Sequence, residues 1–311
     1  MSEINHFALS SILGSEIVGR SKFGHGQIGS LGDAQRYFDT LSVTASPAAL
    51  HQGEEVDIQQ VVKAFHAIRN ARGDRGSSDL YIADPERNAP FLAKCREMGI
   101  QASDYTINKA LLYARKLSHL KGLHSVRTSF NYEEYAFASE FAATELKYLT
   151  GASIDEILCE PALASRFDSI ASSLAPGFTS LRYRWAILSI RKAGRHADWK
   201  PEWQMPEFAG QFRLIRDSLE TIPDKQGVYL LYENGKNKPL YARSTEHLRH
   251  AVEIHRSPRL MSAVFDRLWK PAPDNFVVSY AVLPARSMLR PVEKRVVVER
   301  KPVFNVPRTA A

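Results

Sequence analysis

The chain has 311 residues, of which 44% are hydrophobic and 24% charged, the composition of a globular protein rather than a disordered or collagen-like one. Its two cysteines, Cys95 and Cys159, are too few for a disulfide framework, and no CxxC pair indicates a metal knuckle. No apolar run approaches the ~18 residues of a membrane-spanning helix, and the N-terminal residues lack the pattern of a secretory signal. We therefore expect a cytoplasmic protein with no membrane partner.

The net charge of +7 is unevenly distributed. From Glu220 to the last residue there are 16 lysines and arginines but only 9 aspartates and glutamates, so the whole excess lies in the last third of the chain. A basic surface gains affinity for a polyanion because it releases counterions from phosphates. We expect a DNA partner, in its double-stranded form; a merely solubilising charge is the alternative.

The first two thirds of the chain divide into an irregular segment and a helical region. Residues 1–50 are rich in Gly and Ser, and their stretch GHGQIG at 24–29 fits a dinucleotide-binding pattern. We interpret that stretch as a loop, because no strand precedes it and no acid follows at the required distance. Residues 51–215 show helical periodicity and are expected to form a helical domain. With DNA as the expected partner, the role of this domain would be to recognise the target. Capping residues and glycines predict helices at about 84–99, 103–120, 133–149, 153–173 and 178–192.

Two features of this helical region suggest contact with DNA. The helix pair joined at Gly99 resembles a helix-turn-helix; core packing is the alternative for its second helix. The helix expected over 178–192 combines Tyr183 and Trp185 with four cations, which are Arg182, Arg184, Arg191 and Lys192. Cations contact phosphates and rings stack on bases, unless the rings are core and the cations solvated. Residues 193–212 lack periodicity and are expected to form a linker.

The last third, residues 216–311, mixes strand and helix patterns. Apolar runs at 227–232 and 240–243 flank the turn residues Asn234-Gly235, which predicts a β-hairpin. A helix with Leu248, Val252 and His255 follows, then a second helix at 260–269, a strand at 276–283 and a helix at 291–300. The fold class expected for the whole chain is therefore α+β.

This order of elements resembles the GIY-YIG nuclease family over residues 222–308. The matching positions are Gly227-Val228-Tyr229 at the first motif, Tyr241 at the second and, at the family's spacing, Leu248, His255, Glu293 and Asn305. The resemblance implies a small domain with a three-stranded antiparallel sheet flanked by helices. It also implies phosphodiester hydrolysis with a divalent metal ion.

Two positions depart from the family pattern. The glycine of the second motif is Arg243, and the catalytic arginine expected ten residues after Tyr241 is Ala251. Arg249 and His250 cannot simply substitute, because neighbours on a helix point about 100° apart. Ala251 marks either an engineered replacement of arginine or a natural pseudo-nuclease. Both predict feeble cleavage or none, since such an arginine is worth roughly 10³–10⁵ in rate.

The resemblance assigns a role to each remaining site residue. Glu293 would hold one Mg²⁺ or Mn²⁺ ion together with waters. Tyr229 would order the attacking water or accept its proton, and Tyr241 would hydrogen-bond nearby. His255 would assist proton transfer or phosphate binding, and Asn305 would anchor the site.

Each of these residues also has a purely structural interpretation: the tyrosines as strand aromatics and Glu293 as an acid at a helix N-terminus. Two further expectations concern cations. Arg243 and Arg249 are expected to contact DNA. The histidines at 247, 250 and 255 suggest zinc, but a fourth ligand is missing.

We therefore expect a metal-dependent DNA endonuclease of a restriction or phage-defence type, impaired in cleavage at Ala251. Cutting both strands with a one-metal site predicts either a homodimer or two successive events. Two alternatives stay open. The chain is a natural, non-cutting nucleic-acid-binding protein on a decayed nuclease fold, or its N-terminal region is a platform for protein interaction.

Overall fold

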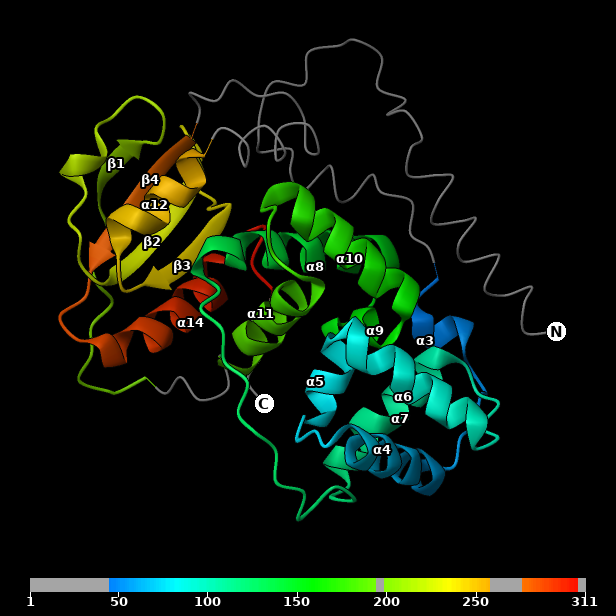
Figure 1. Ribbon diagram of the computed structural model, residues 1–311. Helices are drawn as coiled ribbons and strands as arrows, with labels where there is room; N and C mark the ends of the chain where they lie inside the picture. The colour runs from blue at the N-terminus through cyan, green and yellow to red at the C-terminus, as the bar shows by residue number, and fades with distance from the viewer. Residues whose placement is uncertain (1–44, 194–198, 258–275, 307–311) are drawn as a thin grey trace, which may run out of the picture.

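The computed structural model describes residues 45–193, 199–257 and 276–306 (Figure 1). In this part of the chain, helices accompany one antiparallel sheet, so the expected α+β class is confirmed. The GHGQIG stretch and most of the segment expected to be irregular lie outside the described residues, as does the helix expected over 260–269.

Two helices, α6 Pro85–Glu97 and α7 Asp104–Lys116, begin where the sequence predicts. Asp84 and Ser103 cap α6 and α7 by accepting hydrogen bonds from the backbone N–H of Glu86 and Thr106. The expectation of one helix over 153–173 is wrong, because Glu160 caps a new helix whose first residue is proline. The helices described here are α3 Pro47–Leu50, α4 Ile58–Arg72, α5 Ser78–Ala83, α6 Pro85–Glu97, α7 Asp104–Lys116, α8 Ala136–Thr150 after the 3-10 turn η2 Glu133–Tyr135, α9 Ile154–Cys159, α10 Pro161–Leu174 and α11 Ser180–Ala193.

The helix that a helix-turn-helix would place in the DNA groove is instead packed in the core. In α7, Tyr105 and Asn108 are buried, and the Asn108 amide donates to the carbonyl of Cys159, 2.9 Å away. Tyr105 stacks on the ring of His51. The sequence predicts a DNA-reading face of Asp104, Tyr105, Thr106, Asn108 and Lys109. Because Tyr105 and Asn108 point inward, the core-packing interpretation of this helix pair is favoured.

The sheet has four strands, in the order β1-β4-β2-β3. The predicted hairpin is β2 Gly227–Glu233 with β3 Tyr241–Thr245, and the third predicted strand is β4 Phe276–Val282. A fourth strand, β1 Ala209–Arg213, corrects both the three-stranded expectation and the linker assigned to 193–212. The sequence does not reveal it, because this edge strand buries only Phe212 and so lacks an alternating pattern.

Helices cover both faces of this sheet (Figure 1). On one face α14 Leu289–Arg300 packs Val292 and Val296 against Val228 and Leu230. On the other face lie α12 Leu248–Arg256 and, from the helical region, α8. The face under α12 carries Tyr229, whose hydroxyl lies 2.8 Å from Nε2 of His255 on that helix. The register pairs Tyr229 with Arg243, so Arg243 shares this face.

Helix α8 joins the helical region to the sheet through aromatic contacts. The Phe137 ring lies 5.0 Å from that of Tyr241 and 6.0 Å from that of Phe304, centroid to centroid. Phe141 lies 5.1 Å from Phe304. One hydrophobic core therefore runs from the helices into the sheet. The division into domains at 51–215 and 216–311 stays a prediction.

The structure also describes the two cysteines and the lengths of the helices. Cys95 and Cys159 are buried free thiols, and burial raises the pKa of Cys95 to about 12. Within the described ranges, no helix is both long and apolar enough to cross a membrane.

Candidate functional site

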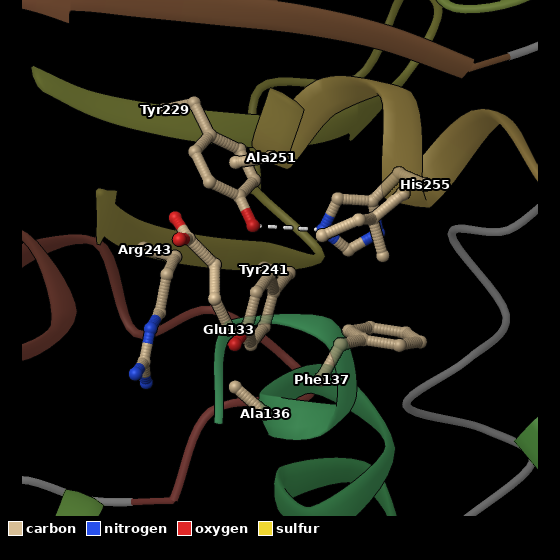
Figure 2. A pocket seen from close by; sticks show the side chains of 9 residues that line it. Glu133, Ala136, Phe137, Tyr229, Tyr241, Arg243, Ala251 and His255 are labelled. Carbon is tan, nitrogen blue, oxygen red and sulfur yellow. Dashed lines mark hydrogen bonds between the residues drawn. The ribbon is translucent and has the colours of Figure 1, made fainter. Parts of the chain in front are cut away.

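A small cavity lies between α12, α8 and the β2–β3 hairpin (Figure 2). Its volume is about 10 Å³, close to the minimum that holds one water molecule. The residues that line it are Glu133, Ala136, Phe137, Tyr229, Tyr241, Arg243, Ala251, Ile254 and His255. Five of the residues singled out in the sequence therefore meet at one place, although they come from two strands and a helix.

The local fold depends on the glycine of the first motif. A Cβ added at Gly227 would lie 2.6 Å from Cδ1 of Leu248 and closer still to the carbonyl oxygen of Ala281. Only glycine therefore lets β2 approach both β4 and α12 at this point. This contact explains why Gly227 and Leu248 occur together, and it positions α12 with Ala251 and His255 over the sheet.

Tyr229 and His255 form a buried, uncharged pair at the centre of the cavity. The phenol oxygen lies 2.8 Å from Nε2 of His255 (Figure 2), and the two residues are 4% and 3% exposed. Burial raises the pKa of Tyr229 and lowers that of His255 to about 4. At neutral pH neither side chain is ionised, so Tyr229 is not activated as a base in this arrangement.

Tyr241 is hydrogen-bonded to Glu140, a residue that no sequence motif singled out. Its hydroxyl donates to Oε2 of Glu140, 2.8 Å away, and burial followed by this carboxylate raises the pKa of Tyr241 well above its usual value. Glu140 lies on α8 and is fully buried. The sequence held one signal for it: an acid inside the apolar run Ala136–Ala143 needs a buried partner.

Glu293 and Asn305 bind the outer edge of β3 rather than the cavity. Oε2 of Glu293 accepts from the backbone N–H of Ser244 at 2.9 Å and from its hydroxyl at 2.6 Å. The Asn305 amide accepts from the N–H of Ala242 and donates to its carbonyl, at 2.8 and 2.9 Å. Together they satisfy the backbone groups that an edge strand leaves unpaired. Asn305 is thus hydrogen-bonded to β3, and its role as an anchor of a catalytic site stays a prediction.

The donor set does not fit Mg²⁺ or Mn²⁺. A hard cation needs several oxygen ligands and free carboxylate lone pairs. Oε2 of Glu293 is taken by Ser244, and its Oε1 lies 3.9 Å from Nη1 of Arg243, a cation. Throughout the described ranges, no three His, Cys, Asp or Glu residues gather in a way that could hold a metal, which also argues against zinc.

Arg243 is held inside the site. Its guanidinium lies 3.4 Å from Glu140 and 5.2 Å from the centre of the Tyr132 ring. Burial acts most strongly and lowers the pKa of Arg243, but Glu293, Tyr241, Tyr132 and Glu140 together outweigh it, so the pKa lies well above its usual value. Arg249, the second arginine expected to contact DNA, points elsewhere and donates to the carbonyl of Ile222 at 3.0 Å.

The four cations of α11 are placed differently from the expected phosphate-binding face. Tyr183 and Trp185 are buried core residues, so neither ring is free to stack on a base. Arg184 is buried in a two-pronged ion pair with Asp168. Arg191 pairs with Asp155 and Lys192 with Asp79, whereas Arg182 lies exposed over the rings of Phe130 and Phe178. Three of the four positive charges are thus compensated within the protein, which corrects the expectation of a free basic face.

The site is closed by the helical region. Ala136 and Phe137 of α8 stand opposite Ala251 and His255, and the Phe137 ring lies 5.1 Å from the His255 ring (Figure 2). Glu133 of η2 also reaches into the cavity and accepts a hydrogen bond from the Thr245 hydroxyl. A group as large as a phosphodiester has no room to enter beside Tyr229.

No family model matches the chain, and no curated protein or solved structure matches it either.

Proposed function

We propose that this protein binds DNA without cutting it, on a scaffold that resembles the GIY-YIG nucleases. The observation that carries the proposal is the burial of the face that would hold the scissile phosphate. Tyr229, Tyr241 and His255 each have a hydrogen-bond partner inside the protein, under α8. Groups satisfied in this way are not available to order a water or contact a phosphate.

Position 251 supports the same reading. Ala251 is 3% exposed and faces a cavity that has room for about one water. An arginine side chain would not fit there without moving α8, so the closed packing goes together with alanine. The cation that would stabilise phosphoryl-transfer charge is absent from α12, and with it roughly 10³–10⁵ in rate.

A separate surface supports DNA binding. Arg290 and Lys294 are four residues apart on α14, so a helical period of 3.6 places them on one side, and Lys301 is the exposed residue that caps the end of this helix. Among the described residues, none of the three forms an ion pair, and all belong to the basic last third of the chain. Unpaired cations in a row are suited to contact phosphates of the DNA backbone.

Replacing these three cations tests the proposal. We expect the triple variant Arg290→Gln/Lys294→Gln/Lys301→Gln to bind duplex DNA more weakly, with the slope of log K against log salt reduced by about 3 units. Binding is measured by fluorescence anisotropy over a salt series, in Mg²⁺ and in EDTA. The nucleic acid is recovered from each sample and analysed for nicks.

A triple variant with the same change of charge is the control. Lys63→Gln/Lys116→Gln/Lys121→Gln removes three exposed cations of the helical region and should leave the slope nearly unchanged. Equal losses from both variants would contradict the assignment of the α14 surface. Metal-dependent nicking by the unaltered protein would contradict the non-cutting function.

A latent metal-dependent endonuclease is the second candidate. It is favoured by the convergence of Tyr229, Tyr241, Ala251 and His255 on one cavity. Under this function, Ala251→Arg should cut supercoiled plasmid or phage genomic DNA in Mg²⁺ while the unaltered chain does not. If both proteins bind and neither cuts, the endonuclease candidate is lost.

A further inference from the structure

One arginine lies between two buried carboxylates that come from different parts of the chain. Nη1 of Arg243 is 3.4 Å from Oε2 of Glu140 and 3.9 Å from Oε1 of Glu293. Glu140 belongs to α8, Glu293 to α14 and Arg243 to the edge strand β3. The guanidinium therefore connects α8 of the helical region with β3 and with α14, which covers the other face of the sheet.

The other oxygen contacts of the two acids fix them in place. Oε1 of Glu140 accepts from the side-chain amide of Asn305 at 3.2 Å and from the backbone N–H of Val306 at 3.3 Å. Its Oε2 also accepts from Tyr241, and Oε2 of Glu293 accepts from Ser244. These donors are neutral, and within the part of the chain that the structure describes the cation found between the two acids is Arg243.

Two carboxylates that share a buried site repel each other unless a cation lies between them. In metal-dependent enzymes a divalent ion supplies that charge. Here a guanidinium supplies it, from the position where the resembling family has glycine in its second motif. The side chain of Arg243 is only 13% exposed, so this cation is a buried part of the protein.

We propose that Arg243 is the resident cation of a two-carboxylate site formed by Glu140 and Glu293, and that this guanidinium makes the site independent of metal ions. The inference goes beyond DNA binding and does not depend on it. Its consequence is that removal of the guanidinium leaves an anionic site open to a divalent cation.

The test compares the thermal stability of variants of the full chain in EDTA and in MnCl₂. For the unaltered protein and for Arg243→Lys, which keeps a positive charge, we expect the same Tm in both solutions. For Arg243→Ala we expect a lower Tm in EDTA that rises by about 2–4 °C or more in MnCl₂, because the ion binds only the folded state. Arg249→Ala removes a neighbouring arginine that contacts neither acid and should show no rise.

Two results would overturn the inference. The first is a Tm of the unaltered protein that rises in MnCl₂ and ceases to rise in Glu293→Gln. The second is an Arg243→Ala variant that gains no more from MnCl₂ than Arg249→Ala does. If Arg243→Ala does not fold in EDTA, refolding from urea is measured with and without MnCl₂. Recovery that requires the ion supports the inference, and no recovery in either solution contradicts it.

Discussion

At the scale of single residues, the tyrosine and the histidine at the centre of the site are both uncharged. The hydrogen bond between Tyr229 and His255 is buried, and burial keeps the phenol protonated and the imidazole unprotonated. The only cation that lines the described part of the cavity, Arg243, is shared with Glu140 and Glu293. The buried hydrogen bond and the compensated arginine are typical of an internal packing interface rather than of an active centre.

The buried His255 predicts a pH dependence of stability. Its pKa is about 4 in the folded state, below the value of 6.5 for an exposed histidine. The unfolded chain therefore binds more protons between these values, and stability falls as the pH is lowered through this window. This linkage predicts a loss of about 2 kcal/mol between pH 7.5 and pH 5 from His255 alone.

Urea unfolding of the unaltered chain and of His255→Gln, at both pH values, measures that loss. The variant should be less stable at pH 7.5 but should lose about 2 kcal/mol less on acidification. An equal loss in both proteins would show that His255 does not titrate in this way.

The sequence predicts some of these residues better than others. The apolar runs that flank Asn234-Gly235 predict the hairpin. That Tyr229 and Tyr241 share a face follows from the register, which pairs Tyr241 with Leu231, two residues after Tyr229. The contacts of Gly227 show why a side chain is excluded there. Glu140 is outside any such pattern, since its partners are more than a hundred residues away in sequence.

At the scale of elements, α8 determines what the sheet face can do. Phe137 contacts the rings of Tyr241, His255 and Phe304, so its removal leaves a cavity at the centre of the shared core. We expect Phe137→Ala to lower the free energy of unfolding by about 3–5 kcal/mol. Tyr113→Ala, which truncates a half-exposed ring of α7, should cost much less.

The same experiment reports whether the two regions unfold together. Helical circular dichroism and tryptophan fluorescence should give one coincident transition in the unaltered chain and in Phe137→Ala. Two separate midpoints would contradict a shared core.

Helix α11 and strand β1 show why element patterns give only part of the fold. The caps and the apolar spacing of α11 are visible in the sequence, but the partners of its cations are not. Asp79, Asp155 and Asp168 lie on three other helices, and only tertiary packing brings them to Lys192, Arg191 and Arg184. β1 likewise exists because β4 offers it a free edge, which no local pattern records.

At the scale of the whole molecule, the helical region completes the sheet rather than standing beside it. Without α8 the rings of Tyr241 and Phe304 would be exposed, and Arg243 would lose the carboxylate of Glu140. We therefore expect residues 206–311, expressed alone, to lack a stable fold, whereas the full chain folds. Amide NMR spectra of the fragment and of the full chain measure this. A well-dispersed spectrum from the fragment would contradict the prediction and would support the domain boundary near residue 215.

Amide hydrogen exchange tests most directly whether α8 keeps the face of the sheet closed. Exchange is followed in α8, β2, β3 and α12 of the unaltered protein, free and saturated with duplex DNA. We expect slow exchange in these four elements in both states, with any new protection confined to α14 and its surroundings. Faster exchange in α8 together with new protection at Tyr229 or Tyr241 would mean that the helix opens and that DNA reaches the face. That result would contradict a closed, non-cutting site.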